Sequence, residues 1–257
     1  MEHHRGARTR VLLALVLVSA PVLIGGSWAG VSNAGDSGSA ASKHSACAGY
    51  EPVLDPRDFV AGVDNPYFPL PVGRTWVYRG VKDGKPQVDR VTVLEKTKVL
   101  EGITAMTVFD VATTPRGRLL ERTFDWYAQD RKGNVWYLGE NTTAYGPHGH
   151  KDHSGSWQAG VHDAEPGIIM EADPQIPDAY RQECRSGKAE DTAWVVRRGG
   201  SLTVPYGTAH HVLDTLEATR IEPAVVDRKV YGRGIGIVLE RSLSGSREVA
   251  RLVKITG

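Results

Sequence analysis

The sequence has no apolar run long enough to form a transmembrane helix. Its longest apolar stretch, residues 11–26, is interrupted by a serine and a proline, whereas a membrane-spanning helix needs about 20 predominantly apolar residues. Because three arginines precede this stretch, the pattern is typical of a signal peptide. We expect residues 1–29 to be removed by cleavage before Gly30, or alternatively before Gly35. The product would be a secreted or otherwise extracytoplasmic protein without a stable membrane span.

Cysteine is scarce, since Cys47 and Cys184 are the two in the whole chain. An even number of cysteines in an oxidising compartment favours a disulfide. Closing so long a loop would stabilise the fold by up to about 5 kcal/mol. Two unpaired thiols are the alternative. The triplet that ends at Cys47 resembles a lipoprotein cleavage site only weakly, because His44 stands where an aliphatic residue is expected.

Neither sign of charge is in excess. The chain has 31 Lys and Arg against 30 Asp and Glu, for a net charge of +1. Acidic and basic residues are interspersed along the sequence, so it contains none of the basic segments with which proteins bind polyanionic nucleic acid. We therefore expect no nucleic-acid partner.

The short motifs of common catalytic sites are also missing. The chain has no HEXXH zinc helix, no Gly-x-Ser-x-Gly elbow, no phosphate-binding loop and no Cys-His nucleophile pair. A Ser-His-Asp triad is recognised by the geometry of the folded chain, so the sequence does not exclude one. Four histidines lie close together, but their spacing matches no standard zinc signature. We expect no metal and no cofactor; the histidines are His148, His150, His153 and His162.

What the sequence does contain, from Asn65 onward, is alternation of apolar and polar residues with a period of two. Segments such as TWVYRGV, VDRVTVLEKTKVL and ITAMTVFDVATT are rich in β-branched residues and are separated by short turns with Gly, Pro or Asp. This pattern predicts antiparallel strands joined by hairpins. Residues 65–257 should form a single mostly β domain of about ten strands. We expect an antiparallel meander that forms a curved sheet or open barrel, preceded by a flexible polar tether over residues 30–64.

The clearest hairpin spans Thr123–Glu140, with residues 131–133 as a three-residue loop and Gly133 in the left-handed conformation. Alternation then divides the side chains between two faces. We predict that one face is core and that the other, amphipathic face either lines a cavity or forms a half-wet surface. The first face carries Phe124, Trp126, Ala128, Trp136 and Leu138, and the second carries Asp125, Tyr127, Gln129, Val135 and Tyr137.

Residues 146–191 interrupt the strand pattern. This segment is rich in Gly, Pro, His and carboxylates, but the apolar residues spread through it argue against disorder. We predict a long ordered central excursion packed over the sheet.

Three carboxylates of this excursion, Glu183, Glu190 and Asp191, would act as general acid and base if they were buried near one another. A simpler interpretation of Glu183 is a structural salt bridge with Arg181, because the two residues share one face of a strand.

Several blocks of the sequence resemble, in the same order, a family of uncharacterised exported bacterial proteins. They begin at Asn65 with NPYFPLPVGRTWVYRG and continue through DWYAQDRKGNVWYLGE, GSWQAGV, PGIIM, YRQE and AED to VYGRGIGIV. The resemblance implies export but no known activity. Cys184 stands where the family usually has a tyrosine and His162 where it has an aspartate, so roles of these two residues are not expected throughout the family. The closing block also resembles, more faintly, β-rich envelope proteins of the half-barrel kind.

These observations favour a non-catalytic binding protein, with the excursion as a lid over an aromatic-lined cavity. The expected partner is an apolar or aromatic small molecule or a lipid. The alternative is a secreted hydrolase with a carboxylate or metal site in the excursion. The residues predicted to line the binding site are Trp126, Tyr127, Trp136, Tyr137, Trp157 and Met170.

Overall fold

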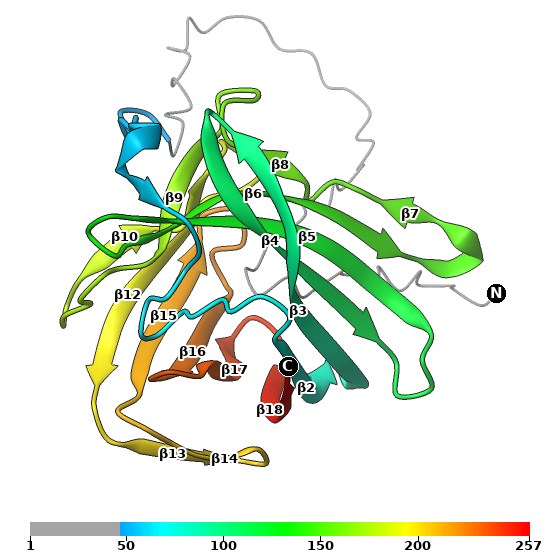
Figure 1. The fold of residues 1–257 in the computed structure, drawn as a ribbon. Coiled ribbons are helices and arrows are strands. Elements are labelled where there is room, and N and C mark those ends of the chain that lie inside the picture. Colours follow the sequence, from blue (N-terminus) through cyan, green and yellow to red (C-terminus); the bar gives the residue numbers. More distant parts are fainter. Residues whose placement is uncertain (1–46) are drawn as a thin grey trace, which may run out of the picture.

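A computed structural model describes residues 47–257, so the predicted signal peptide, its cleavage site and the first part of the predicted tether lie outside the described residues. The described chain is almost entirely β-structure (Figure 1), with two short 3-10 helices, η1 (Pro56–Asp58) and η2 (Pro147–Gly149). No helix in this part of the chain is long and apolar enough to cross a membrane. The strands are β1 (Phe59–Val60), β2 (Thr75–Lys82), β3 (Lys85–Leu100), β4 (Ile103–Thr113), β5 (Leu119–Asp130), β6 (Val135–Tyr145), β7 (Lys151–Asp152), β8 (Trp157–Gln158), β9 (Glu165–Met170), β10 (Ala179–Arg181), β11 (Glu183–Cys184), β12 (Asp191–Arg198), β13 (Ser201–Val204), β14 (Gly207–His210), β15 (Leu213–Thr219), β16 (Val226–Gly232), β17 (Gly236–Ser244) and β18 (Glu248–Thr256).

Sixteen of these strands form one antiparallel sheet. Its main path runs β10-β12-β15-β16-β17-β18-β2-β3-β4-β5-β6-β9-β11. β10 and β11 are two halves of one extended segment, in which β10 pairs with β12 and β11 pairs with β9. The two ends of the strand order therefore meet, and the sheet is nearly closed into a barrel (Figure 1). The predicted mostly β, antiparallel fold is confirmed.

The central excursion is ordered, as predicted, but most of it does not lie over the sheet as a lid. Its strands β9, β10 and β11 form part of the barrel wall and join β6 to β12. The short strands β7 and β8 also pair with β6, at residues 144–145 and 139–140 respectively. Low sequence periodicity here reflects strands of two to six residues, which are too short to show alternation.

The β5–β6 hairpin has the predicted three-residue loop. The N–H of Asp130 donates to the carbonyl oxygen of Asn134 over 2.9 Å, and Gly133 has a φ of 97°. Tyr127 lies opposite Tyr137, as alternation from this loop requires.

Beyond this point a β-bulge pairs Trp126 with Gly139. Gly139 has a φ of 133°, and a Cβ atom there would lie 2.5 Å from the carbonyl oxygen of Trp157, so glycine is required. The bulge shifts the alternation of β6 by one residue. Consequently Glu140, which follows the bulge, turns its side chain to the same face as Tyr137 and Asp125.

Both faces of this hairpin are buried. Tyr127 and Tyr137 belong to the main core inside the barrel. Trp126 packs in a smaller outer cluster with Leu100, Ile103, Ala105, Ala128, Leu138 and Ala159, and Trp136 packs against it. The tyrosine face was predicted either to line a cavity or to form a half-wet surface. The half-wet surface is wrong, because the barrel places both tyrosines in its main core, where Tyr127 lines a hollow. The tryptophan face is buried too, but in the smaller outer cluster.

The ordered domain also begins earlier than Asn65. β1 pairs with β5, and Leu54 and Phe59 cover the outer cluster around Trp126. Residues 55–64, which belong to the predicted tether, thus pack against the folded domain.

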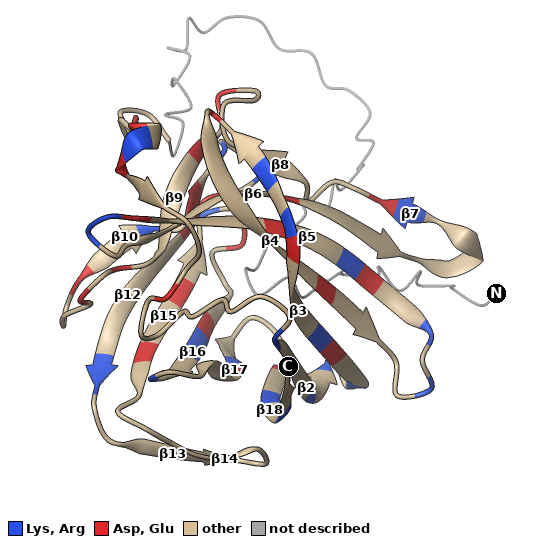
Figure 2. Ribbon diagram, in the orientation of Figure 1, with Lys and Arg blue, Asp and Glu red and all other residues tan. Residues whose placement is uncertain are grey.

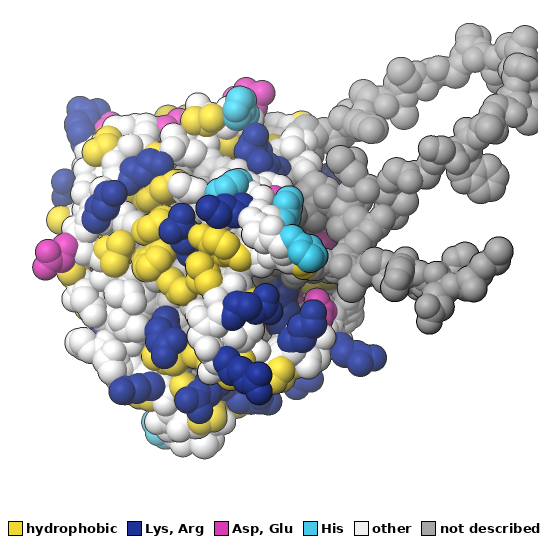
Figure 3. Space-filling model, turned by 90° about the vertical axis from the view of Figure 1, so that its right-hand side faces the viewer, with side chains coloured by type: hydrophobic (Ala, Val, Ile, Leu, Met, Phe, Trp, Pro, Cys, Tyr) yellow, Lys and Arg dark blue, Asp and Glu magenta, His cyan; other side chains and the backbone are white. Residues whose placement is uncertain are grey.

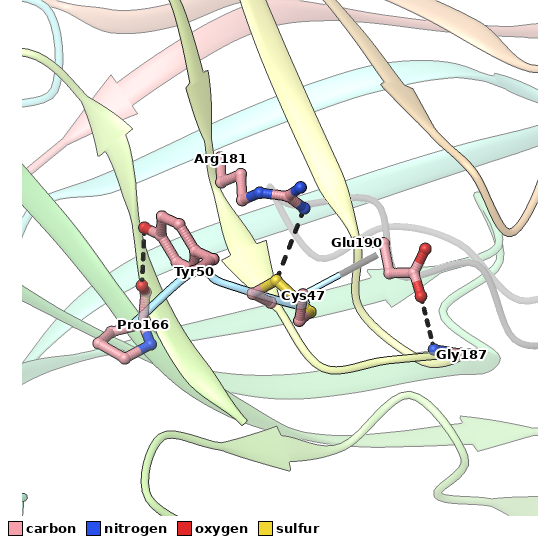
Figure 4. Close-up of a disulfide and its surroundings, with 7 residues drawn as sticks. Cys47, Tyr50, Pro166, Arg181, Gly187 and Glu190 are labelled. Atoms are coloured by element: carbon pink, nitrogen blue, oxygen red, sulfur yellow. Dashed lines mark hydrogen bonds between the residues drawn. A yellow bond between two sulfur atoms is a disulfide. The ribbon is translucent and has the colours of Figure 1, made fainter. Parts of the chain in front are cut away.

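The predicted disulfide is present. Cys47 and Cys184 are bonded, with their Cα atoms 5.6 Å apart and 137 positions apart in sequence (Figure 4). Next to the bond, the hydroxyl of Tyr50 donates to the carbonyl oxygen of Pro166 over 3.1 Å. The bridge therefore fastens the start of the described chain to the segment that closes the barrel.

Candidate functional site in the barrel interior

The interior of the barrel is divided into an apolar end and an acidic end. Along β2 the inward side chains run from Trp76 and Tyr78 to Lys82, and along the antiparallel β3 they run from Asp89 to Val91. Each strand therefore contributes apolar side chains to one end and a charged side chain to the other.

The apolar end contains an aromatic-lined hollow, partly open to solvent, with a cavity volume of about 30 Å³. The loop over residues 61–74 crosses this opening (Figure 1), and Phe68 packs edge-on against Tyr127 with ring centroids 5.1 Å apart. A cavity of this size admits only the tip of an apolar group, such as a terminal methyl, with the remainder of a ligand outside it. It is lined by Phe68, Pro69, Leu70, Trp76, Tyr78, Val91, Val108, Tyr127, Gly236 and Ile237.

Two hydrogen bonds fix the aromatic wall of this hollow. The indole N–H of Trp76 donates to the carbonyl oxygen of Ile235 over 2.7 Å, and the hydroxyl of Tyr78 donates to that of Ile237 over 2.9 Å. Both side chains reach past β18 to the start of β17. Because the polar atoms of both rings are satisfied, the rings offer mainly apolar surface to the hollow.

The other end of the interior is an acidic belt. Nearly every strand of the wall contributes a buried carboxyl group to it, and two buried lysines lie among them. The carboxyl residues of the belt are Asp89, Asp110, Glu121, Asp125, Glu140, Glu183, Asp191, Glu217, Asp227, Glu240 and Glu248, and the lysines are Lys82 and Lys229.

An ion pair joins one lysine to the belt. The Nζ atom of Lys229 lies 2.6 Å from Oε2 of Glu217, and the two side chains are 0% and 1% exposed. Glu217 Oε1 also accepts a hydrogen bond from the hydroxyl of Thr215 over 2.9 Å. Burial alone would lower the pKa of Lys229, but the negative charges of Glu217 and Glu240 outweigh it and raise that pKa. Lys229 therefore stays charged in the interior.

The remaining carboxyls are affected mainly by desolvation. Burial raises the pKa of Asp125 to about 7, although the hydroxyl of Tyr137 donates to its Oδ1 over 2.9 Å. It raises the pKa of Asp191 to about 8 against the attraction of Lys229. The pKa of Asp110 rises well above its usual range, first by burial and then by the neighbouring charge of Asp89. Because counter-charges are few, burial favours the protonated form of these carboxyls, and Asp191 with its pKa of about 8 is largely protonated at neutral pH.

At the rim of the belt, a second and smaller hollow is lined by Tyr78, Lys82, Gln87, Asp89 and Glu248, among others. Burial raises the pKa of Glu248 to about 8 and lowers that of Lys82 to about 8, and each charge opposes the shift of the other. Tyr78 lines this hollow as well as the apolar one, so its ring separates the two ends of the interior.

The structure brings together four of the six residues predicted to line a binding site. Tyr127 and Tyr137 stack with centroids 4.9 Å apart, and Trp157 contacts Tyr137 edge-on at 5.1 Å. Met170 lies in the same core. Trp126 and Trp136 lie on the outer face of the hairpin, where Lys98 covers the Trp126 ring at 3.3 Å.

Of the three carboxylates predicted in the excursion, two lie together and the third lies apart from them. Glu183 and Asp191 face each other inside the belt, and the pKa of Glu183 rises well above its usual range through burial and then the charge of Asp191. Glu190 instead accepts a hydrogen bond from the N–H of Gly187 over 2.6 Å (Figure 4). Arg181 does not pair with Glu183; its guanidinium lies 5.5 Å from the ring centre of Tyr50.

The four clustered histidines are all exposed. Over residues 47–257 the structure contains no group of three or more His, Cys, Asp or Glu side chains arranged to hold a metal ion.

Sequence reasoning missed the acidic belt and most of the apolar hollow. A signal was present, because Asp89, Glu121 and Asp125 occupy the same parity as apolar residues of their strands. In an open sheet these acids would face solvent, and closure of the barrel is what buries them.

No protein-family model matches the chain, and no curated protein matches it. Two solved structures are similar. A putative lipoprotein from Parabacteroides distasonis is 13% identical, with a TM-score of 0.40 over 75% of this chain and 99% of that chain. A putative exported protein with a YmcC-like fold from Bacteroides fragilis is also 13% identical, with a TM-score of 0.40 over 74% of this chain and 99% of that chain.

Proposed function

We propose that this protein is an exported, non-catalytic binding protein that holds an apolar group of a small molecule or lipid at the apolar end of its barrel. The observation that carries the proposal is the hollow lined by aromatic and aliphatic side chains at the barrel opening. Ligand sites are typically concave and mostly apolar, and barrel mouths are a common place for them.

Export is supported by two features of the chain. The N-terminal residues have the pattern of a signal peptide. The disulfide between Cys47 and Cys184 is of a kind that persists in oxidising compartments and is rare in the cytosol.

The proposal is tested by titrating the purified protein with a neutral fluorescent naphthylamine probe. Val108→Phe adds a ring to the hollow and should weaken probe binding at least ten-fold. Phe68→Ala, which widens the hollow, should keep or strengthen binding. The double variant His148→Ala and His150→Ala changes exposed residues outside the barrel and should bind like the wild type.

Circular dichroism of each variant separates loss of the site from loss of the fold. Native mass spectrometry of the purified protein adds an independent observation, because a retained apolar molecule would appear as a mass difference. Equal probe binding by folded Val108→Phe and wild-type protein would contradict the proposal.

A second candidate is a hydrolase that uses the belt. Glu183 and Asp191 are buried together, and burial raises the pKa of Asp191 to about 8, as a general acid at neutral pH requires. If a hydrolytic activity is found and Glu183→Gln abolishes turnover while the fold is unchanged, this second function replaces the first.

A further inference from the structure

The outer face of the same strands carries the opposite charge from the interior. Each buried acid is followed in the sequence by an outward residue, and several of these are arginines, as in Asp89-Arg90 and Glu121-Arg122. Figure 2 shows the consequence as red and blue bands side by side along β3 and β5. The near-zero net charge of the chain therefore conceals two separated populations of charge.

Strand register places the outward bases in rows across β18, β2, β3, β4 and β5. One row reads Lys254, Val77, Arg90, Val111 and Arg122, so that bases and valines alternate from strand to strand. Neighbouring strands lie about 4.8 Å apart. Successive bases of this row are therefore anchored about 10 Å apart.

The next row places two arginines directly opposite each other, Arg251 on β18 and Arg79 on β2. Like charges that face each other across a strand pair destabilise the isolated sheet. Both arginines are exposed, as are Arg90, Arg122 and Lys254. Among the ion pairs of the described chain, none uses these five side chains. An anionic partner would relieve this repulsion.

The rows also form a shallow groove on the outer face. It is lined by three of the bases together with hydroxyl and aliphatic side chains, namely Thr75, Val77, Arg79, Arg90, Val253, Lys254 and Thr256. Arginine and lysine with flanking hydroxyls are the donors that bind phosphate oxygens.

Apolar side chains lie between the bases. Phe109 and Phe124 stack with ring centroids 4.5 Å apart and lie half-buried on the outer face of β4 and β5. Figure 3 shows a face of the molecule on which Lys and Arg surround a hydrophobic area and Asp and Glu are few. An exposed surface with both kinds of side chain suits the boundary of a membrane, where phosphates and apolar chains are both within reach.

We propose that the basic face, defined as the outward rows of β18, β2, β3, β4 and β5, docks on membranes rich in anionic phospholipid. Each base attracts a headgroup phosphate, and the valines and the phenylalanine pair contact the headgroup boundary. A soluble polyanion would use the bases but would leave the apolar side chains between them uncovered. This inference does not depend on the proposed ligand in the barrel.

The test is co-sedimentation of the full chain with vesicles of equal parts phosphatidylglycerol and phosphatidylcholine, compared with phosphatidylcholine alone. Wild-type protein should bind the anionic vesicles at least ten-fold more tightly than the neutral ones, and binding should weaken as salt is raised. The triple variant Arg79→Gln, Arg90→Gln and Arg122→Gln should lose at least ten-fold of this affinity.

A matched triple variant, Lys132→Gln, Arg220→Gln and Arg233→Gln, removes the same charge from exposed turns outside these rows. It should bind like the wild type. Equal binding by both triple variants, or equal binding of wild type to neutral vesicles, would overturn the proposal. So would soluble polyphosphate that displaces the protein from anionic vesicles at equal phosphate concentration, because it would identify a soluble polyanion as the partner.

Discussion

The two faces of strands β2 to β5 differ in burial and in charge, although both are formed by the same strands, whose side chains point alternately to one face and the other. The inner face carries Asp89, Asp110 and Asp125 in the buried interior, where desolvation raises their pKa values. The outer face carries Arg90 and Arg122 in solvent. The comparison shows that alternation separates charge as effectively as it separates apolar from polar residues, and that composition alone cannot reveal it.

Only the inner face couples charge strongly to stability. Exposed charges are hydrated and screened, and single exposed ion pairs contribute about 0 to 1 kcal/mol. A buried charge without its partner costs several times more, because the interior cannot hydrate it. The predictions below test this difference.

The largest effect is expected from breaking the interior ion pair. Glu217→Gln removes the negative charge 2.6 Å from Lys229 and should lower the free energy of unfolding by about 3 to 5 kcal/mol. Urea denaturation measures the change. Arg90→Gln on the outer face is the matched control and should alter stability by less than about 0.5 kcal/mol. Similar losses of stability in the two variants would show that a charge on the inner face affects stability no more than a charge on the outer face.

The second effect is a dependence of stability on pH. Burial raises the folded-state pKa of Asp125 to about 7 and those of Asp191 and Glu248 to about 8, whereas such groups titrate near 4 when unfolded. Between about pH 4 and 8 the folded state therefore binds more protons than the unfolded state. The stabilisation that these three carboxyls contribute is fully present below about pH 4 and is lost as pH rises through about 7 to 8.

Thermal melts at pH 5 and pH 8 measure this loss, and the melting temperature should be higher at pH 5. Leu252→Ala, a truncation of a fully buried side chain at the apolar end, should lower the melting temperature by a similar amount at both pH values. A wild-type melting temperature that rises from pH 5 to pH 8 would contradict the assigned direction.

The smallest effect is expected from neutralising one acid of the belt. Asp110 is fully buried and its pKa lies well above the usual range, first through burial and then through Asp89. Asp110→Asn is a replacement of nearly the same shape and should change stability by less than about 1 kcal/mol at pH 5. Because burial favours the neutral form of Asp110, the stability of the variant relative to the wild type should rise from pH 5 to pH 8. Urea titration at both pH values checks this, and a relative stability that falls from pH 5 to pH 8 would contradict the direction of the pKa shift.

Much of the local structure could be predicted from the sequence. The period of two gave the strands, and the Arg131–Gly133 loop with its glycine set the register of the β5–β6 hairpin as far as Tyr127 and Tyr137. The presence of two cysteines in an exported chain predicted the disulfide between them. These features depend on neighbouring residues or on simple counts, so no knowledge of distant contacts was needed.

Little of the candidate site could be predicted. Among the six residues predicted to line a binding site, Tyr127 lines the hollow, whereas Tyr137, Trp157 and Met170 share the core with it. Trp126 was assigned to the same site because the sequence does not say which face of a hairpin turns inward.

What the sequence determined by itself is therefore local: strand positions, turns, and the two sets of side chains that alternate along each strand. What the tertiary structure decided is which set became the interior. β18 pairs with β2, and the Ala179–Cys184 segment joins β9 to β12, so the sheet closes upon the face that carries the tyrosines and the acids. Closure removes one face from water, and that burial raises the pKa values of carboxyls that would be ordinary surface groups in an open sheet. It leaves their arginine neighbours as an exposed basic face.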